Sequence, residues 1–284
     1  MKLRKIAIGT FDGLHTGHMA VLEKIKGDIE NSFALTFNLP PKQIEEKTQL
    51  LMSYEEKNSL IKEMGITPVT LNFNKIKEIS AEDFLKYLLK EYSPSLIVTG
   101  FNFKFGKGAA GDVQTIKKFC IENSVDFFAA PEVKYNKTTV SSTNIRNYIK
   151  SGEVEIANKM LGRCFGFCGE IIHGDKRGRT LGFPTINQAY PENLVTPRLG
   201  VYSGHTYIDG KEYVSLTNVG YRPTFKTERI FSETHIFDFN KDVYGKNARI
   251  TLEHFLRDEH KFNSIDELKE AVELDKKSAL LKNI

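Results

Sequence analysis

The sequence has few cysteines and no long hydrophobic run. Its 284 residues include three cysteines, Cys120, Cys164 and Cys168, and no C-x-x-C pair. This odd number without metal-ligand spacing favours buried free thiols in a cytoplasmic protein, with a metal or redox site as the alternative. No apolar run reaches the roughly 20 residues of a membrane span. The N-terminal apolar stretch is broken by Gly9, so we predict no signal peptide.

A strong charge of one sign is also missing. Lys and Arg total 40 and Asp and Glu total 36, which gives a formal net charge of +4. This excess is compatible with phosphate-bearing ligands but is too small to indicate a nucleic-acid partner. We therefore expect small-molecule substrates, with no nucleic acid and no membrane as partner.

The first half of the chain alternates strand-like and helix-like segments. The strand-like runs are "KIAIGTF", "FALTFNL", "TPVTLNF", "SLIVTGF" and "VDFFAAP". Helical segments between them begin at the capping residues Ser53 and Ser80. Nearly continuous apolar strands separated by helices predict an open parallel sheet covered on both faces. Ligands of such sheets bind beyond the carboxyl ends of the strands.

From about residue 160, short β-like runs follow one another with glycine-rich turns. The segment "IDGK" reads as an Asp-Gly hairpin turn, and a final helix is expected from Ser264. Evenly spaced short strands indicate a small barrel or sandwich. The boundary falls in "KSGEVEIANKMLGR", which we expect to be helical. We predict two domains, residues 1–155 and 156–284.

The stretch "GTFDGLHTGH" at residues 9–18 follows the first strand directly. A glycine-punctuated turn between a strand and a helix offers backbone N–H groups to phosphate. His15 and His18 lie about one helical turn apart, so both can face one ligand, and imidazoles can donate to phosphate oxygens. The alternative is a pair of structural histidines beside a turn. The predicted nucleotide-binding residues of this turn are Gly9, Thr10, Phe11, Asp12 and Gly13.

A second phosphate motif is "VSSTNIRNYI" at residues 140–149. Ser142 and Thr143 sit at a predicted helix start, where N–H groups are exposed, and Arg146 follows one turn later. Arginine can bind phosphate bidentately. The alternative is a plain helix cap. The two motifs together resemble the signature of the nucleotidyltransferase superfamily. The resemblance implies that the two histidines contact ATP phosphates and stabilise the charge on departing pyrophosphate.

The segment "GFNFKFGKGAAGD" at residues 100–112 joins aromatic rings to a basic glycine-rich loop. This combination suits a planar ligand that carries phosphates, and Asn102 and Phe105 are its candidate contacts. The alternative is that Phe103 and Phe105 belong to the core.

The segment "HGDKRGRTLGFPTIN" at residues 173–187 begins with a basic glycine-rich loop, which is not a P-loop because G-x-x-x-x-G-K-[ST] is absent. Thr185 and Asn187 alternate on a predicted strand and point to one face. Their hard oxygens suit a Mg²⁺ that arrives with nucleotide phosphates, and a turn with an edge strand is the alternative. The predicted nucleotide contacts here are Gly174, Lys176, Gly178, Thr180, Thr185 and Asn187.

These residues, followed by "GVYSG", "NVGYRPTF", "ETHIFDFNKDVYG" and "FLRDEHKF", resemble the riboflavin kinase domain. The resemblance implies that Thr185 and Asn187 hold Mg²⁺ and nucleotide, and that Glu233 is the general base for the ribityl hydroxyl. A carboxylate that hydrogen-bonds the attacking hydroxyl is a suitable base. The resemblance also makes Arg257 a candidate flavin contact.

In this order the two halves resemble the prokaryotic bifunctional riboflavin kinase/FMN adenylyltransferases. The family implies a Rossmann-like nucleotidyltransferase domain followed by a six-stranded riboflavin kinase β-barrel with a C-terminal helix. It implies the substrates riboflavin, FMN and ATP, with Mg²⁺ as cofactor. It also makes Asn102 and Phe105 the candidate flavin contacts of the first half. Many members carry a histidine after the second strand, where this chain reads "TFNLPPKQ". Two alternatives stay open: an enzyme that has kept one activity, and a flavin- or RNA-binding regulator.

Overall fold

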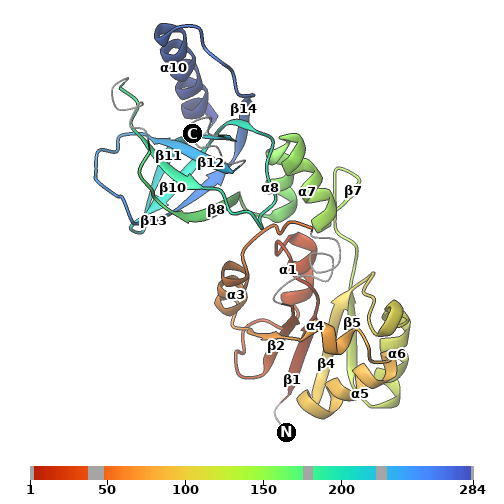
Figure 1. The fold of residues 1–284 in the computed structure, drawn as a ribbon. Helices are drawn as coiled ribbons and strands as arrows, with labels where there is room; N and C mark the ends of the chain where they lie inside the picture. The colour runs from red at the N-terminus through yellow and green to blue at the C-terminus, as the bar shows by residue number, and fades with distance from the viewer. Residues whose placement is uncertain (1–2, 38–47, 175–181, 222–228, 283–284) are drawn as a thin grey trace. The chain divides into compact units, whose positions relative to one another are not determined.

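The computed structural model describes residues 3–37, 48–174, 182–221 and 229–282. The chain folds into two compact units, residues 1–142 and 143–284, which Figure 1 colours in sequence from red to blue. This division comes earlier than the predicted boundary at residue 155. Helix α7 (Ser142–Ser151) largely belongs to the second unit, where the Arg198 N–H donates to the carbonyl oxygen of Ile149 at 3.2 Å. The predicted connector helix is α8 (Val154–Leu161).

The first unit contains a five-stranded parallel sheet in the order β3-β2-β1-β4-β5. Its strands are β1 (Arg4–Ile8), β2 (Ser32–Thr36), β3 (Thr67–Thr70), β4 (Pro94–Gly100) and β5 (Asp126–Ala130). The predicted strand runs are confirmed. Because the chain moves outward from β1 to β3 and then restarts on the other side with β4, β1 lies where the strand order reverses. Ligands of open sheets bind beyond the carboxyl end of a strand at such a point.

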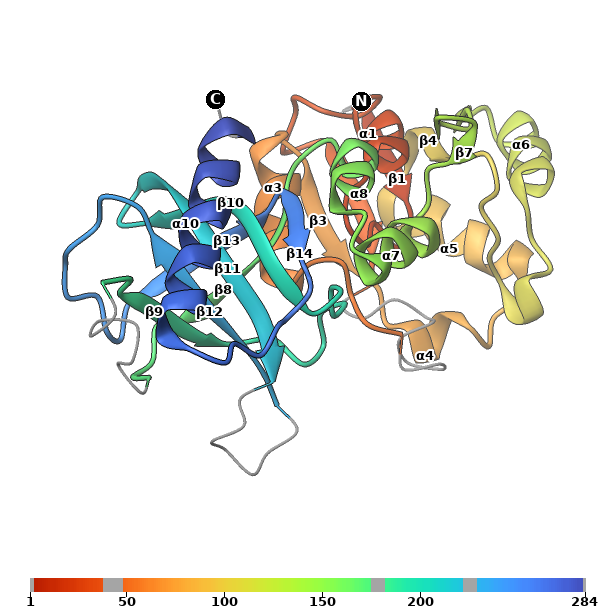
Figure 2. The same ribbon diagram turned by 90° about the horizontal axis from the view of Figure 1, so that it is seen from above.

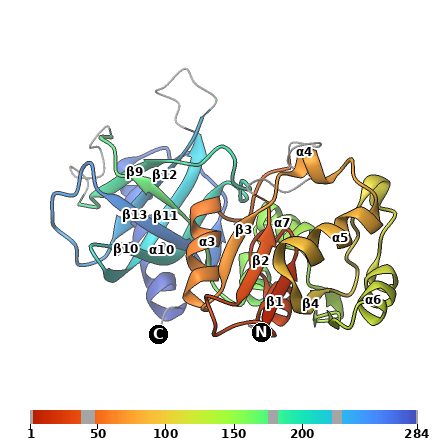
Figure 3. The same cartoon turned by 90° about the horizontal axis from the view of Figure 1, so that it is seen from below.

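Helices cover both faces of this sheet (Figures 2 and 3). Ile6 and Ile8 pack in a buried cluster with residues of α5 (Ala81–Tyr92) and α6 (Val113–Glu122). Ala7, between them, packs in a second cluster with α1 (Thr16–Leu22) and α3 (Tyr54–Glu63). The alternation follows from the two-residue period of a strand. A short helix, α4 (Phe73–Ile76), a 3₁₀ turn, η1 (Lys107–Ala109), and a hairpin of β6 (Lys134–Tyr135) and β7 (Thr138–Thr139) complete the unit.

The predicted caps are present at three helices. The Ser53 hydroxyl accepts from the Glu56 N–H at 3.1 Å, and the Ser80 hydroxyl accepts from the Asp83 N–H at 3.0 Å. In the second unit the Ser264 hydroxyl accepts from the Glu267 N–H at 3.1 Å. Each cap satisfies an N–H that has no partner within its own helix.

The second unit is a curled antiparallel sheet in the order β8-β13-β10-β11-β12-β9, with β14 also pairing with β10. Its two end strands approach each other, since the Ile172 N–H donates to the Asn187 carbonyl at 2.8 Å. Asp209 and Gly210 form the predicted two-residue hairpin turn, with φ of 51° and 72°. The strands are β8 (Phe165–Glu170), β9 (Thr185–Ala189), β10 (Gly200–Ile208), β11 (Lys211–Tyr221), β12 (Ile230–Ile236), β13 (Asn247–Leu252) and β14 (His254–Arg257).

The barrel fold class is confirmed, but the described residues form seven strands rather than six. The run "ARITLEHFLR", predicted as one strand, breaks at Glu253 into β13 and β14. Glu253 turns its N–H to the carbonyl of Ser203 at 2.9 Å, and its carboxylate accepts from His205 Nδ1 at 2.8 Å. The chain therefore bends at Glu253 while it continues along β10, and β13 and β14 act as one bent strand.

Helix α10 (Ile265–Lys282) is the predicted C-terminal helix and packs against the sheet in Figure 2. Its buried Ala279 lies in one cluster with Val201 of β10 and Leu216 of β11. Among the described residues, no helix is long and apolar enough to cross a membrane.

The expectation of buried free thiols holds for part of the set. All three cysteines are free, and Cys120 is buried, but Cys164 is partly exposed and Cys168 is exposed. Cys168 follows the buried Phe167 on β8, and successive strand residues face opposite sides. Burial raises the pKa of Cys120 to about 11 and that of Cys164 to about 11, which keeps both as unreactive thiols at neutral pH.

We predict that Gly166→Ala destabilises the second unit by about 1–3 kcal/mol, because an added Cβ would collide with the Ile250 carbonyl oxygen of β13, which is backbone and cannot turn away. Gly169→Ala on the same strand is the matched control. Its nearest neighbour would be the Gln188 side chain at 3.4 Å, an ordinary contact. Urea unfolding of the two variants measures the difference, and equal midpoints would contradict the expectation.

Candidate functional sites

The first candidate site is the turn after β1, residues Gly9–Gly13, which we call the β1 turn. Phe11 has a positive φ of 50° and Gly13 one of 81°, and Leu14 follows with 38°. Such angles are uncommon for residues other than glycine and concentrate at functional sites. Phe11 is buried and lies against Gly9, where a Cβ would approach its ring to 3.0 Å. The conformation therefore needs glycine at position 9 as well as at position 13.

Hydrogen bonds tie the β1 turn to neighbouring elements. The Thr10 carbonyl accepts from the Thr36 hydroxyl at 2.9 Å, and the Asp12 carbonyl accepts from the Ser142 hydroxyl at 2.8 Å. The buried Asp12 carboxylate accepts from the Leu51 N–H at 3.0 Å. Asp12, predicted to contact nucleotide, therefore holds the shape of the turn through its carboxylate.

The two histidines lie together directly behind this turn. Their rings stack with centroids 3.6 Å apart and an interplanar angle of 15°. His15 is the N-cap of α1, and its Nδ1 accepts from the His18 N–H at 3.2 Å. His18 also meets the Phe11 ring edge-on at 5.5 Å. A bond accepted at Nδ1 leaves Nε2 as the protonated nitrogen of a neutral His15, so that edge of the ring is a donor.

The second predicted phosphate motif begins α7. Ser142 is tied to Asp12 as described, so the structure brings these two motifs together at Ser142. Thr143 is in the first turn of the same helix, where N–H groups have no intrahelical partner. Arg146 lies one turn further and is 7% exposed. Both belong to the second unit.

The predicted flavin segment of the first unit divides into core and surface. Phe105 is buried, stacks on Phe103 with centroids 5.6 Å apart and packs against Phe84. This position agrees with the core alternative for its ring. Asn102 is exposed and lies beside Gly100, and Phe101 is 43% exposed. The exposed ring next to Asn102 is thus Phe101. The sequence alone could not show which of the three phenylalanines in this segment is exposed.

In the second unit, Thr185 and Asn187 lie on β9 and face the same side, as predicted. Their cross-strand partners on β12 are His235 and Glu233. Asn187 is 5% exposed, and a Cβ on Gly174 would collide with its side-chain amide. Glycine at 174 therefore lets the start of the basic loop lie against Asn187. Lys176, Gly178 and Thr180 lie outside the described residues.

A cavity of about 380 Å³ opens on this face of the sheet. Glu233 and Asn218, partners across β11 and β12, line it together with Thr185. Apolar walls come from Phe183, Val201, Leu216, Phe262, Leu268 and Val272. An apolar cavity with a few converging polar groups is typical of a site for a planar small molecule. Arg257 also lines this cavity.

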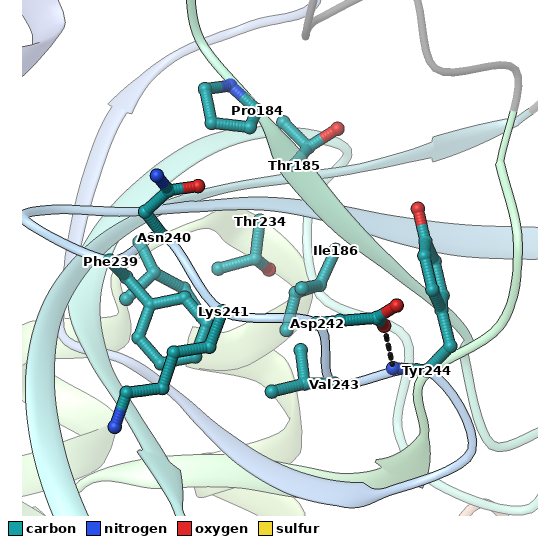
Figure 4. Close-up of a pocket in the computed structure, with 11 residues that line it drawn as sticks. Pro184, Thr185, Ile186, Thr234, Phe239, Asn240, Lys241, Asp242, Val243 and Tyr244 are labelled. Atoms are coloured by element: carbon teal, nitrogen blue, oxygen red, sulfur yellow. Dashed lines mark hydrogen bonds between the residues drawn. The ribbon is translucent and has the colours of Figure 1, made fainter.

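A smaller pocket of about 50 Å³ lies between β9, β12 and the loop at residues 239–244 (Figure 4). Thr185 lines this pocket as well as the large cavity. The loop is fixed by the Asp242 carboxylate, which accepts from the Tyr244 N–H at 3.2 Å. Thr185 therefore borders both openings, and the smaller one has room only for water-sized groups.

Arg257 is held firmly at the edge of the cavity. Its Nε and one terminal nitrogen donate to the buried Asp275 carboxylate of α10 at 2.8–3.2 Å. Its guanidinium lies 5.5 Å from the centroid of the Phe262 ring. The next residue but one, Glu259, accepts from the Asn218 amide at 3.1 Å. These contacts fold the segment after β14 along the cavity.

Two comparisons of the sequence with known proteins agree with this geometry. The sequence model for FAD synthetase matches residues 2–144, and the model for riboflavin kinase matches residues 161–281. A bifunctional riboflavin kinase/FMN adenylyltransferase of Bacillus subtilis is 32% identical, over 97% of this chain and 91% of the relative. Its counterpart in Listeria monocytogenes is 33% identical, over 95% and 89%. The chain belongs to the family of bifunctional riboflavin kinase/FMN adenylyltransferases.

A solved structure described as a macrolide-efflux protein of Streptococcus pneumoniae has the same fold as this family member, with a TM-score of 0.86 and 27% identity. The likeness covers 98% of this chain and 94% of that one, and the efflux description belongs to that protein. The family's two activities phosphorylate riboflavin to FMN with ATP and then transfer AMP from ATP to FMN. The chain is thus an enzyme of FAD biosynthesis, a kinase and an adenylyltransferase.

Four residues at these sites of the family member were missed in the sequence. They are Lys57 beneath the β1 turn, and Asn218, His235 and Asp275 around the cavity. Asn218 and His235 could have been found from strand register, since they flank Glu233. Lys57 and Asp275 lie on helices, where a single charged residue is usually a solvent-facing one. No signal in the sequence separates them from the other charges of their helices.

We predict that Asp275→Asn destabilises the second unit by about 1.5–3 kcal/mol, because Arg257 loses charge-assisted hydrogen bonds in a mostly buried place. Asp258→Asn is the matched control. Asp258 makes a bidentate pair with Arg198 at 2.7 Å on the exposed surface, where such pairs are worth about 0.2–1 kcal/mol. Urea unfolding compares the two, and an Asp258 effect as large as that of Asp275 would show that burial does not matter here.

Proposed function

We propose that the two activities use two separate sets of residues. The β1 turn with His15, His18, Ser142, Thr143 and Arg146 serves adenylyl transfer, and the β9–β12 face with Thr185, Asn187 and Glu233 serves the kinase. The observation that supports this proposal is that the two candidate sites lie in different units. The stacked imidazoles behind the strained turn are in the first unit, and the cavity lined by Glu233 is in the second. The proposal keeps cytoplasmic localisation, in agreement with three free thiols.

In the adenylyltransferase site the phosphates of ATP lie at Gly9–Gly13 beside Ser142, and Thr143 and Arg146 are further phosphate contacts expected from the sequence motif. Backbone N–H groups there are suited to phosphate. The two imidazoles donate to the phosphate oxygens as pyrophosphate leaves, which is a role for donors fixed before the reaction. FMN supplies its own phosphate as nucleophile, so no side chain forms a covalent bond. Asn102 and the neighbouring rings, Phe105 from the core side, support the flavin.

In the kinase site riboflavin lies in the large cavity with its ribityl chain toward Glu233, and the terminal phosphate of ATP lies at Thr185. Thr185 borders the large cavity, which supports this placement. Glu233 accepts the proton of the ribityl hydroxyl as its oxygen attacks the γ-phosphorus, and ADP leaves. The flavin packs against the apolar walls, with Arg257 at its edge. Gly174, Lys176, Gly178 and Thr180 belong to the loop proposed to contact the nucleotide.

The family's use of ATP implies a divalent metal, and we propose Mg²⁺. The Thr185 hydroxyl and the Asn187 amide oxygen are hard donors on one face of β9 and fit an ion of this type. The described residues hold no cluster of three or more His, Cys, Asp or Glu suited to a metal. Two protein oxygens leave most of the shell to phosphates and water, as is usual for this ion. When bound, Mg²⁺ neutralises phosphate charge.

We predict that His15→Ala with His18→Ala lowers FAD formation from FMN by at least about a hundredfold, because two preorganised donors are lost. FMN formation from riboflavin by the same preparation should stay unchanged and is the internal control. Separation of the flavins after incubation with riboflavin, ATP and Mg²⁺ measures both. Loss of both activities in a folded variant would contradict the proposal of two sites.

We predict that Glu233→Gln lowers FMN formation by about 10²–10⁴-fold, since the amide keeps the shape but cannot accept the proton. Riboflavin binding should change little. Glu212→Gln is a control on an exposed carboxylate of β11. Single-turnover FMN formation and flavin fluorescence titration measure the two effects. A variant that phosphorylates riboflavin within a few-fold of the parent would exclude Glu233 as the base.

A further inference from the structure

A lysine is buried directly beneath the β1 turn. Lys57 lies on α3 and is 3% exposed. Its ammonium donates to the Phe37 carbonyl at 2.6 Å, to the Thr36 hydroxyl at 3.1 Å and to the Thr10 carbonyl at 3.4 Å. These three acceptors use all three donors of the ammonium. They also lie at the carboxyl ends of β1 and β2, where the nucleotide is proposed to bind.

The charge of Lys57 is only partly balanced by the protein. Its three hydrogen-bond acceptors are neutral oxygens, and in the described part of the chain no carboxylate forms an ion pair with it. The titratable groups that face it are Asp12 from the turn and Tyr54 from its own helix, whose ring centroid lies 5.6 Å from Nζ. A buried charge without a direct partner is unfavourable. Burial accordingly lowers the pKa of Lys57 to about 8, although Asp12 acts in the opposite direction.

We propose that Lys57 is the buried cation that balances the polyphosphate of ATP at the β1 turn, and that nucleotide binding and protonation of Lys57 are coupled. The inference rests on the proposed function of the turn. Lys57 bonds the Thr10 carbonyl within the turn itself, so its charge lies 3.4 Å from an atom of the backbone proposed to hold phosphate. Lys57 is a positioning residue, since its donors are used by the protein.

The coupling has a definite sign. An anion bound near an ammonium favours the charged form and raises its pKa. Because coupling is reciprocal, ATP then binds more tightly when Lys57 is protonated. At pH 7 and below, about one unit under its pKa, the lysine already holds its proton, and binding takes up almost none. Between pH 8 and the higher pKa of the complex, each bound nucleotide takes up a proton, and its affinity falls up to tenfold per pH unit.

The ligand-free protein carries the opposite dependence in its stability. The pKa of Lys57 is lower in the fold than its ordinary value of 10.5, so the unfolded chain binds more protons between pH 8 and 10.5. Stability contributed by this group therefore rises with pH across that window. As the pH rises through this window, nucleotide affinity falls while the stability of the free protein increases. A lysine with a purely structural role would change the stability but not the nucleotide affinity.

The first measurement uses the full chain and the KM for ATP in FAD formation from FMN, between pH 7 and 9.5. For the parent we expect the KM to be constant below pH 8 and to rise up to tenfold per unit above it. Lys57→Gln keeps a hydrogen-bond donor but has no charge. Its KM for ATP should therefore be at least tenfold higher than that of the parent at pH 7, and it should show no rise above pH 8. Lys62→Gln, an exposed lysine on the same helix, is the matched control.

The second measurement does not depend on turnover. Calorimetry with a non-hydrolysable ATP analogue at pH 8.5, in two buffers of different ionisation enthalpy, counts the protons taken up on binding. The triphosphate is fully ionised at this pH, since a phosphate's second pKa is about 6. We expect uptake by the parent and less by Lys57→Gln. No uptake by the parent overturns the inference whether or not the variant folds.

Two further outcomes are decisive. If Lys57→Gln lowers FMN formation as much as FAD formation, the lysine serves the fold alone and the inference is wrong. If the parent makes FAD while its KM for ATP follows the same pH curve as that of Lys57→Gln, the Lys57 inference fails and the site assignment stands. If His15→Ala with His18→Ala forms FAD as fast as the parent, the assignment of the adenylyltransferase site is wrong.

Discussion

The first unit depends on one constraint: the carbonyl oxygens of the β1 turn, which lie at the carboxyl end of a central strand, must be satisfied by donors from neighbouring elements. Thr36, Lys57 and Ser142 supply the donors from β2, α3 and the start of α7. These bonds hold Phe11 at a positive φ and so set where His15 and His18 stand. Strain of this kind persists only where the surroundings over-determine it.

In the second unit, glycines rather than a buried cation allow polar groups to pack closely against the backbone. Gly174 lies where any side chain would displace the Asn187 amide, and Gly220 lies where a side chain would displace the Glu259 carboxylate. Both contacts border the row that runs from Asn187 through Glu233 to Asn218 across three strands. Close approach of backbone to polar side chains is a common use of glycine. In the second unit the proposed site residues Asn187 and Glu233 stand on regular strands, which hold side chains more precisely than loops do.

The sequence predicted what depends on local periodicity and short motifs. The five parallel strands, the caps at Ser53, Ser80 and Ser264, and the Asp-Gly hairpin all follow from spacing along the chain. The break at Glu253 could not be predicted, because it depends on bonds to Ser203 and His205 from another strand. The place of α7 in the second unit depends likewise on a tertiary contact with Arg198. Lys57 was missed because its burial is set by β1 and β2 and not by its own helix.

Lys57 also shows that the β1 turn is not arranged for stability alone. A buried cation without an ion-pair partner costs free energy, and replacement of such groups by apolar residues is often neutral or favourable for folding. Proteins retain unfavourable groups of this kind mainly where activity requires them. The same partly balanced charge becomes more favourable when a polyphosphate arrives, since the ligand supplies an anion that the described residues provide only through Asp12. The unfavourable energy in the free protein and the affinity for nucleotide are therefore two consequences of one placement, Lys57 beneath the Thr10 carbonyl.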